Sequence, residues 1–473
     1  MSKKGKMMVF AVVLVVATLS SITVVTVLNS RNNLTINLTN SSNQTSTGNT
    51  NKSEDNTNWP MFQHDAQHTG WSHSNVSTTN QLLWSHFVNI SSSPVVSNGR
   101  VFTGSNDGNI YALDKSSGEE VWNTRIEEQL LNLSVGSTYD LLSLAVANEM
   151  VYVGAISNFY SFDAQTGEKI WEFALKNFSA PRLPTIANGK VFIGCYYTGP
   201  RLGLVGETVS NTLYVLNETD GEEIWEFITV DDVDSSVAVA NGKVFLSSYG
   251  KTYALDEETG KEIWNVSIES PSSLLVINNM VFVGSPSGVY ALNELTGSEI
   301  WSFATIWRTE SLAFADDTLF IASCWNVSAL NISNGNEFWN FTTEYGSSSV
   351  VVADNAVIVC SDKIYALNKS TGELFWSFNV PVGIYNTSYV WYHPAIAGGI
   401  IFCGCGNGKL YAFGISENSS TEKSISKSSF LPNNIGIMII AIGVVVASLV
   451  ATTCNKKKEK DVVTEKRGGK LNG

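Results

Sequence analysis

Charged residues are scarce in this chain, at 15% of 473 residues, whereas 44% of the residues are hydrophobic. The charge that is present is unbalanced, with 29 Lys and Arg against 43 Asp and Glu and a net charge of −14. Between Trp59 and Ile415 there are 15 basic and 36 acidic residues, a net charge of −21. Such a surface repels phosphate backbones and anionic lipid headgroups, so the composition argues against nucleic-acid binding.

Signatures of common catalytic and metal sites are also missing. The sequence has no GxSxG, HExxH or Walker loop, and no CxxC pair with zinc spacing. Five of its six cysteines lie between the hydrophobic ends, so at least one of these thiols is unpaired. Cys403 and Cys405 lie two residues apart on a predicted strand and point to the same face, where they are poorly placed to bridge each other. The role that suits them is that of small buried hydrophobic residues.

Long uncharged runs occur at both ends of the chain. Lysines precede an apolar stretch from Met7 to Leu28, which predicts a signal peptide or an N-terminal membrane anchor; the two remain open. Residues 435–453 are 19 residues without a charge, long enough to span a bilayer, and a basic tail follows directly. The positive-inside rule predicts that this tail is cytoplasmic and that the middle of the chain lies outside the cell.

Polar stretches separate the membrane segments from the middle of the chain and read as flexible stalks or linkers. The sequence holds 17 Asn-x-Ser/Thr sequons, about twice the number that chance gives, which favours a glycosylated surface protein. The predicted organisation is a signal peptide or anchor (1–28), a stalk (29–58), a repeat domain (59–415), a linker (416–434), a transmembrane helix (435–453) and a cytoplasmic tail (454–473).

A twelve-residue unit recurs along the repeat domain. In YALDEETGKEIW, Tyr253 precedes Trp264 by eleven residues, and the same spacing separates Tyr from Trp in five other copies and Ser328 from Trp339 in a variant copy. Each copy reads as a strand, a turn held by Asp or Asn and closed by Gly, and a second strand. Two further apolar runs precede each copy, so a unit is four short antiparallel strands in about 37–39 residues.

Four-stranded repeats of this period build a β-propeller, because a single blade cannot bury both of its faces. We therefore predict an all-β fold with eight blades, in which Trp on the outermost strand fills the widening space between neighbouring blades. Trp84 has no Tyr before it and Tyr411 has no Trp after it, so we expect the Trp84 strand to close the ring beside the Tyr411 strand. The predicted docking residues are Trp84, Trp122, Trp171, Trp225, Trp264, Trp301, Trp339 and Trp376.

The Ala-Leu-Asp-x-x-Thr-Gly-x-x-x-Trp unit resembles the tryptophan-docking repeat of the pyrroloquinoline-quinone-like (PQQ-like) propellers. The family includes quinoprotein alcohol dehydrogenases and the barrel-assembly lipoprotein of bacterial outer membranes, and the chain resembles the lipoprotein more than the dehydrogenases. The resemblance covers about Trp59 to Phe413 and implies the fold more strongly than the function. It also implies that the segment containing His64, Asp65, His68 and His73 is an entry segment packed against the disc, so we expect no metal there.

The dehydrogenases of this family use charged and amide residues on the inner strands, calcium and often adjacent cysteines. Here the inner strands offer Ser and small apolar residues, and a quinone with three carboxylates needs cationic partners. Arg182 alone does not make such a site, so no cofactor and no catalytic residue are predicted.

Three insertions interrupt the regular spacing, near Thr124–Asp140, Cys195–Asn211 and Pro381–Tyr392. Because strands in a meander alternate in direction, loops after second strands and after outer strands emerge on one face of the disc. Exposed aromatic residues with Arg are typical of binding faces. The predicted binding face carries Arg125, Tyr139, Tyr196, Tyr197, Arg201, Tyr385, Tyr389, Trp391, Tyr392 and His393.

The sequence thus predicts a membrane-anchored extracellular propeller that acts without catalysis, as a scaffold or recognition module for protein, peptide or glycan. The alternative is a membrane-bound quinoprotein dehydrogenase.

Overall fold

The computed structural model describes residues 57–126, 142–155, 157–176, 179–197, 211–229, 231–233, 235–248, 250–344, 346, 349–381 and 392–415. The predicted membrane segments, the linker and nearly all of the N-terminal stalk lie outside these residues. In the described part, no helix is long and apolar enough to cross a membrane.

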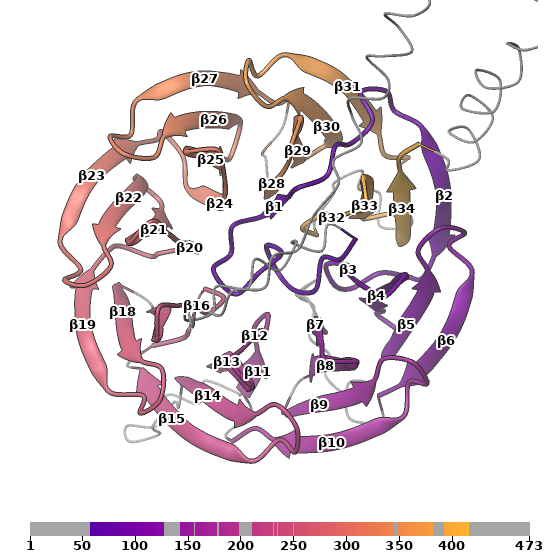
Figure 1. Ribbon diagram of the computed structural model, residues 1–473, viewed down its shortest axis with the longest axis horizontal. Helices are drawn as coiled ribbons and strands as arrows, with labels where there is room; N and C mark the ends of the chain where they lie inside the picture. The colour runs from indigo at the N-terminus through magenta and orange to yellow at the C-terminus, as the bar shows by residue number, and fades with distance from the viewer. Residues whose placement is uncertain are drawn as a thin grey trace, which may run out of the picture. The chain divides into compact units, whose positions relative to one another are not determined.

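Eight antiparallel sheets are arranged around a common axis, which confirms the predicted eight-bladed propeller (Figure 1). We number the blades in chain order. Blade 1 contains β3 (Val95–Ser97), β4 (Arg100–Gly104), β5 (Asn109–Asp114) and β6 (Glu120–Arg125). Blade 2 contains β7 (Ser143–Ala147), β8 (Met150–Ala155), β9 (Asn158–Asp163) and β10 (Lys169–Ala174). Blade 3 contains β11 (Ser179–Pro181), β12 (Thr185–Ala187), β13 (Lys190–Tyr197), β14 (Asn211–Asn217) and β15 (Glu223–Thr229). Blade 4 contains β16 (Ala238–Ala240), β17 (Lys243–Ser248), β18 (Lys251–Asp256) and β19 (Glu262–Ser267).

The remaining blades follow the same plan. Blade 5 contains β20 (Ser273–Ile277), β21 (Met280–Ser285), β22 (Gly288–Asn293) and β23 (Glu299–Ala304). Blade 6 contains β24 (Thr309–Ala315), β25 (Thr318–Ser323), β26 (Asn326–Asn331) and β27 (Glu337–Thr342). Blade 7 contains β28 (Ser349–Ala353), β29 (Ala356–Cys360), β30 (Lys363–Asn368) and β31 (Leu374–Asn379), with β1 (Trp71–Ser72) added in parallel to β28. Blade 8 contains β32 (Ala395–Ala397), β33 (Ile400–Gly404), β34 (Lys409–Phe413) and β2 (Leu82–Phe87).

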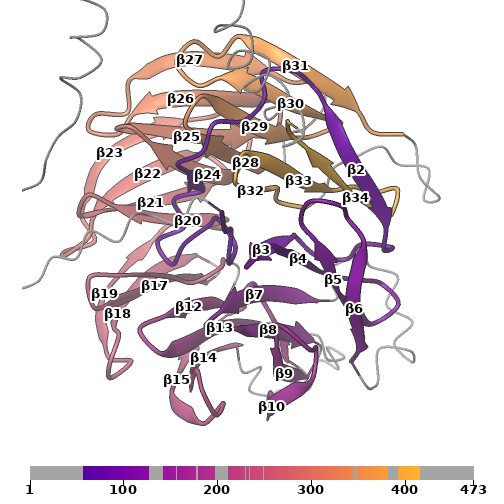
Figure 2. The ribbon, with the colours of Figure 1, turned by 45° about the vertical axis from the view of Figure 1, so that its right-hand side comes forward.

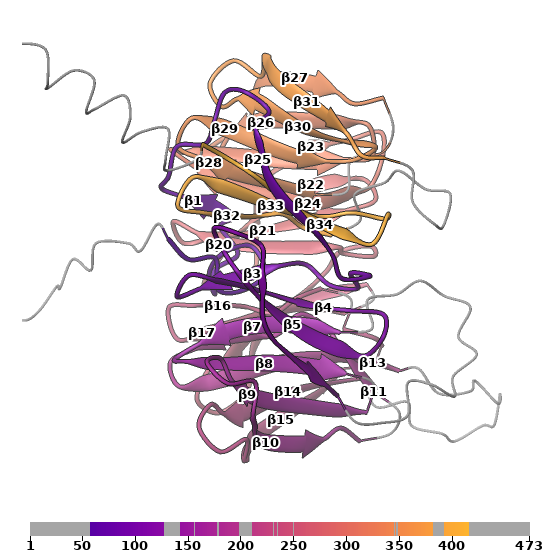
Figure 3. The same cartoon turned by 90° about the vertical axis from the view of Figure 1, so that its right-hand side faces the viewer.

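The strands of each blade run across the thickness of the disc (Figures 2 and 3). Within a blade they follow one another from the innermost strand at the axis to the outermost strand at the rim. The alternation of direction gives the disc two distinct faces. We call the turn face the one that carries turns such as Asp114–Gly118, between third and fourth strands. The insertion face is the opposite one, where loops such as residues 305–308 and 324–325 follow fourth and second strands.

Each outer-strand Trp joins its blade to the next one. Trp264, for example, lies against Phe245 of its own blade, with ring centroids 6.0 Å apart, and its indole N–H donates to the Glu294 carbonyl of blade 5 at 2.9 Å. The indole N–H groups of the other seven docking residues also donate to backbone carbonyls, at 3.0–3.2 Å except for Trp301 at 2.9 Å. The repeated Trp therefore combines apolar packing with a fixed hydrogen bond between blades.

The turn that receives each Trp depends on glycine. In blade 5, the side chain of Asn293 accepts hydrogen bonds from the Leu295 and Thr296 amides, and Gly297 has φ +71°. A Cβ added to Gly297 would lie 2.8 Å from the Trp264 ring. Glycine is thus required both by the left-handed conformation and by the contact with Trp. The predicted Asx-to-Gly turn is confirmed.

Closure of the ring uses the two ends of the propeller. β2 pairs with β34 as the outer strand of blade 8, with Leu82 opposite Phe413 and Ser85 opposite Tyr411. This pairing confirms the closure expected from Trp84 and Tyr411. Blade 8 therefore has no chain turn between its third and fourth strands, and Trp376 donates instead to the Ser77 carbonyl at 3.0 Å, just ahead of β2.

Residues 59–76, the entry segment, cross the centre of the ring (Figure 1). Backbone amides of six inner strands donate to carbonyls of this segment: those of Val96, Val146, Val239, Val276, Phe314 and Val352. The distances are 2.7–3.0 Å. The contacts lie near the ends of the inner strands on the turn face, so the chain itself closes that end of the axis.

Replacing Trp264 by Ala tests the docking contact. We expect the free energy of unfolding to fall by about 3–5 kcal/mol, because a buried ring and its hydrogen bond to Glu294 are both lost. The measurement is chemical denaturation of both proteins. Trp307→Ala is the matched control, because its side chain is 55% exposed, and a loss within about 0.5 kcal/mol is expected. Equal melting of Trp264→Ala and the parent would contradict the docking role.

Deleting residues 59–90 tests the closing strand. The deletion removes β2 and the entry segment, exposes the edge of β34 and should produce aggregation, since unpaired edges template further pairing. Light scattering and thermal melting give the readout, and deletion of residues 30–56 is the control. A monomer with unchanged melting after deletion of 59–90 would show that closure does not depend on these residues.

Candidate functional site

The predicted binding face is only partly described by the structure. Tyr139, Arg201, Tyr385, Tyr389 and Trp391 lie outside the described residues, and Tyr197 is described only by its backbone, as the last residue of β13. The structure places the side chains of Arg125, Tyr196, Tyr392 and His393. These four residues belong to three different parts of the ring and do not form one cluster.

Tyr196 lies beside Arg182 in blade 3. The guanidinium carbon is 4.4 Å from the centre of the Tyr196 ring, a cation–π contact. The Arg182 carbonyl accepts a hydrogen bond from Ser143 Oγ of blade 2 at 3.1 Å. The pair therefore stands at the junction between two blades, close to their inner strands.

Tyr392 and His393 are half-buried and connect blade 8 to the start of blade 1. The Tyr392 hydroxyl donates to the Ile90 carbonyl at 3.1 Å, and the His393 backbone N–H donates to Ser93 Oγ at 3.0 Å. The His393 ring meets Phe62 of the entry segment edge-on, with centroids 4.7 Å apart. Both side chains thus contribute to the frame of the ring as well as lying near the predicted face.

An aromatic pair on the insertion face was not predicted. Trp307 and Trp325 are stacked, with ring centroids 6.4 Å apart and an interplanar angle of 15°. They are 55% and 50% exposed, and the neighbouring Ile306 is 89% exposed. Trp307 follows the outer strand β23 and Trp325 precedes β26, so both loops emerge on the insertion face. The sequence sets this pair apart in one way: neither Trp307 nor Trp325 lies eleven residues after a Tyr, as the docking Trp residues do.

The entry-segment histidines are directed to different partners. The ring nitrogens of His68 lie 3.2 Å from the Leu274 carbonyl and 3.3 Å from Thr185 Oγ1, whereas those of His64 and His73 approach Asp65 and Asp354. Among the described residues, no group of three or more His, Cys, Asp or Glu is placed to hold a metal ion.

Burial decides the protonation of the axial histidines. His68 is fully buried, and burial lowers its pKa to about 4, although the nearby Asp65 carboxylate acts in the opposite direction. Burial likewise lowers the pKa of His393 to about 4, and the proximity of His68 adds to the effect. Both imidazoles are therefore neutral at pH 7. The His68 ring serves as a packing and hydrogen-bonding group, and the His393 ring packs against Phe62.

The axis does not suit a tricarboxylate quinone. In the eight innermost strands the side chains are Ala, Val, Ile, Leu, Phe, Ser and Thr, and Glu310 is the single charged residue. The Glu310 carboxylate repels an anionic ligand. Arg308 Nε lies 3.6 Å from Glu310, so the positive charge of Arg308 is already partly compensated by this carboxylate. These strands therefore lack the cations that such a cofactor requires.

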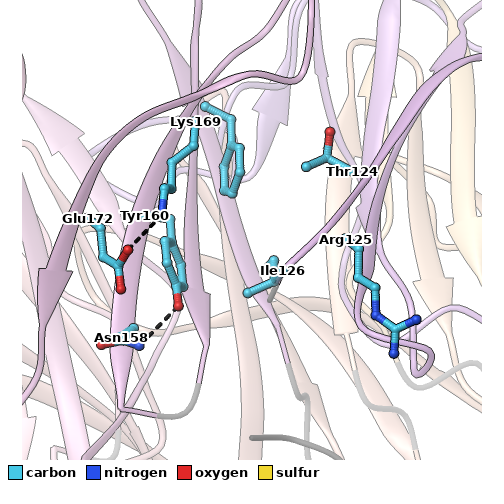
Figure 4. Close-up of a pocket in the computed structure, with 8 residues that line it drawn as sticks. Thr124, Arg125, Ile126, Asn158, Tyr160, Lys169 and Glu172 are labelled. Carbon is cyan, nitrogen blue, oxygen red and sulfur yellow. Dashed lines mark hydrogen bonds and ion pairs between the residues drawn. The ribbon is translucent and has the colours of Figure 1, made fainter. Parts of the chain in front are cut away.

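A pocket of about 390 Å³ lies at the rim between blades 1 and 2 (Figure 4). Blade 1 contributes Thr124, Arg125 and Ile126, and blade 2 contributes Asn158, Tyr160, Phe162, Lys169 and Glu172. Lys169 Nζ lies 2.8 Å from a Glu172 oxygen, and Asn158 Nδ2 donates to the Tyr160 hydroxyl at 3.0 Å. Of the predicted face, Arg125 is the residue that borders this pocket.

Comparison with known proteins identifies the repeat. The family model described as outer membrane protein assembly factor BamB matches residues 69–204, 209–344 and 325–420. The BamB of Nitrosomonas eutropha is 27% identical over 184 residues, covering 38% of this chain and 39% of that protein. Quinohemoprotein alcohol dehydrogenase ADH-IIG of Pseudomonas putida is 28% identical over 162 residues, covering 32% of this chain and 21% of that protein.

Solved structures agree on the fold. Quinohemoprotein alcohol dehydrogenase from Comamonas testosteroni superposes with a TM-score of 0.64 at 13% identity, over 76% of this chain and 80% of that chain. The matched segments span less than half the length of the two curated relatives. These likenesses therefore concern the propeller and not the whole of either enzyme or assembly factor.

The buried His68 predicts a pH-dependent stability. Its pKa is 6.5 in the unfolded chain and about 4 in the folded one, so the unfolded chain binds more protons between these values. Stability therefore falls as the pH drops from about 6.5 toward 4, by up to about 3 kcal/mol from this group. Melting temperatures of the parent and His68→Gln, measured from pH 7 to pH 4.5, provide the test.

Two other titratable groups, His393 and Asp65, also make the stability depend on pH. His393 contributes in the same window. Burial acts to raise the pKa of Asp65, but the nearby His64 ring and the hydrogen bonds from Thr69 outweigh it and lower that pKa. The stability that this carboxylate adds is therefore lost only as the pH falls below its usual pKa range. His68→Gln should flatten the profile in part, and the slope that remains is that of His393. Parallel profiles for parent and His68→Gln would contradict the assignment.

Proposed function

The chain belongs to the PQQ-like propeller family described as outer membrane protein assembly factor BamB, and on that basis we propose that it is a non-catalytic scaffold or recognition module. The observation that carries the proposal is how the chain fills the axis of the ring. The entry segment hydrogen-bonds to six inner strands there, and the inner strands present apolar and hydroxyl side chains. The propeller axis thus serves to hold the ring together, and recognition is left to the surface.

The insertion face is the surface best suited to bind a partner. Stacked Trp307 and Trp325, with Ile306 beside them, form an exposed apolar group of the kind that dominates the binding energy of protein interfaces. The insertions near Thr124–Asp140, Cys195–Asn211 and Pro381–Tyr392 are expected on the same face from the alternation of strand direction in the sequence. The turns of the opposite face are nearly uniform between blades and offer little by which to distinguish partners.

The ends of the chain support a location at the cell surface. The apolar runs at 7–28 and 435–453, the basic tail and the sequons favour a glycoprotein with an extracellular propeller and a C-terminal transmembrane helix. The partner is then a protein, a peptide or a glycan met at the outer surface, and a protein is favoured by the assembly-factor relatives. Labelling of intact cells with a membrane-impermeant reagent, followed by mapping of the labelled residues, tests the orientation.

The alternative function is that of a membrane-bound quinoprotein dehydrogenase, which the similarity to a quinohemoprotein alcohol dehydrogenase suggests. The inner strands disfavour it, because Glu310 is their single charged residue. Addition of pyrroloquinoline quinone and calcium to the purified chain discriminates between the two functions. Saturable binding seen as a change in quinone absorbance would favour the dehydrogenase.

Substitution of the aromatic pair tests the proposed face. A partner is first captured by cross-linking at the cell surface and then purified, so that its affinity for each variant can be measured. Trp307→Ala combined with Trp325→Ala should weaken binding tenfold or more, about 1.4 kcal/mol, with unchanged melting because both rings are half-exposed. Truncation of the Pro381–Tyr392 insertion to the length of the short blades should have a similar effect.

A turn-face variant provides the control. Glu258 lies in the turn between β18 and β19 with a side chain that is 75% exposed, and Glu258→Ala should leave the affinity unchanged. If Glu258→Ala weakened binding while the aromatic variants did not, the partner would dock on the turn face instead.

A further inference from the structure

Two buried thiols are in contact across the junction between blades 7 and 8. Cys360 is the last residue of β29 and Cys403 lies in β33, the second strands of two neighbouring blades (Figure 1). Their sulfur atoms are 3.9 Å apart, and neither side chain is exposed. The fold therefore brings into direct contact two cysteines that are 43 residues apart in the chain.

The alternation of side chains along the strands explains why these two cysteines face each other. Phe402, next to Cys403, packs against Trp84, with ring centroids 5.9 Å apart, and Trp84 docks on blade 1. Because neighbouring residues of a strand point to opposite faces, Cys403 points toward blade 7. Cys360 belongs to the same apolar cluster and meets Cys403 from the blade 7 side.

The other described cysteines have different surroundings. Cys195 in blade 3 and Cys405 in blade 8 each donate a hydrogen bond to the carbonyl two residues earlier, at 3.9 Å and 3.8 Å. Cys324 lies in the loop between β25 and β26 of blade 6. Cys405 is close enough to Cys360 for the two thiols to influence each other's ionisation, so it is the competing partner that a test must separate.

We propose that Cys360 and Cys403 form a disulfide bond that links blade 7 to blade 8. An S–S bond is about 2.0 Å long, so the two sulfur atoms must approach each other by about 1.9 Å. Both residues lie near the ends of their strands, beside the loops at 361–362 and 405–408, and rotation of the two side chains there supplies this movement. The inference goes beyond the proposed function and shares with it the location outside the cell, where disulfides form and persist.

The bond forms by exchange with a disulfide donor, either a small disulfide such as oxidised glutathione or an oxidoreductase. The thiolate of one cysteine attacks a donor sulfur, which breaks the donor S–S bond and gives a mixed disulfide. The thiolate of the second cysteine then attacks the first cysteine's sulfur and releases the second donor thiol. Two electrons and two protons pass from the cysteine pair to the donor, which leaves as two thiols.

Burial requires that the bond form before the ring closes. Apolar surroundings raise the pKa of Cys403 well above its usual range, and the hydrogen bond with Cys360 adds to the effect, so the closed ring disfavours the thiolate that exchange needs. The rim of this junction is completed only when Trp376 donates to the Ser77 carbonyl, just ahead of β2. Before that step a donor reaches the sulfurs from the rim, and afterwards the same burial protects the bond from reductants.

The bond holds the incomplete blade 8 in place for closure. β32, β33 and β34 come last in the domain, and their outer strand β2 comes from the other end of the propeller. A link from β33 to β29 fixes these three strands against blade 7, so that the edge of β34 is already positioned when β2 pairs with it. The entropic cost of the closing step is reduced accordingly.

Peptide mapping is the direct test. The full-length chain is isolated from the cells that make it in denaturant with iodoacetamide, so that free thiols are alkylated, and is digested without reductant. The expected result is a pair of peptides joined through Cys360 and Cys403 that separates on reduction, with Cys195 and Cys405 alkylated. Alkylation of all six cysteines, or a link from Cys360 to Cys405, would overturn the assignment.

Refolding separates the geometry of the pair from the compartment. The purified chain is unfolded, reduced and refolded in mixtures of reduced and oxidised glutathione. The parent and Cys405→Ala should acquire the link, whereas Cys403→Ala should not. If the parent refolds with both thiols free in every mixture, the geometry does not permit the bond. A link that forms on refolding but is missing in cells would overturn both the native disulfide and the extracellular location.

Thermal melting with and without a phosphine reductant measures the effect of the link. The linked parent should melt about 4 °C or more above the reduced parent, because the cross-link restricts the unfolded chain. Cys360→Val, which keeps an apolar side chain in the junction, should melt equally in both buffers, and Cys405→Ala should keep the difference seen in the parent. A change in packing alone lowers both melting temperatures together, so equal melting of the parent in the two buffers would show that Cys360 and Cys403 serve packing only.

Discussion

Everything in this structure depends on the contact between an outer-strand Trp and the turn of the next blade. The indole lies over a Gly in the left-handed conformation and donates one hydrogen bond to a turn carbonyl, as Trp264 does over Gly297 and to Glu294. A blade in isolation would leave both faces of its sheet in water, so its neighbours are part of its fold. The hydrogen bond fixes the orientation of each indole, and the contact with Gly fixes how closely it approaches the next blade. The repeated contact therefore sets the angle between blades and so the number of blades that close the ring.

The frame varies at the positions where the repeat is broken. The loops that carry Trp307 and Trp325 depart from the repeat by adding exposed aromatic side chains outside the docking register. The BamB and dehydrogenase relatives share the frame, and the innermost strands of this chain carry Glu310 as their single charged residue.

The blade count, the strand order and the closing strand could be predicted from the sequence because each leaves a periodic mark. The spacing from Tyr to Trp gives the register, and the unpaired Trp84 and Tyr411 give the closure. The hydrogen bonds of the entry segment could not be predicted, since they join backbone groups and leave no residue signature. Tyr392 and His393 were expected on the face, and the structure shows them also tied to Ile90 and Ser93, because they directly precede an inner strand. The pairing of Trp307 with Trp325 could not be predicted, because both lie off the eleven-residue register and in two separate loops.

The pairing of β2 with β34 has a consequence for how the ring is made. β2 is synthesised before any blade, and its partner is the last strand of the last blade. During synthesis, the strands of blades 1 to 7 are therefore all made before β34, and β2 has no ladder partner until β34 is made. Closure requires contact between residues at nearly the greatest separation the domain allows, which is the slow kind of step in folding. A chain stalled or truncated near its C-terminus would hold two complementary open edges, and two such chains could exchange strands with each other rather than close on themselves.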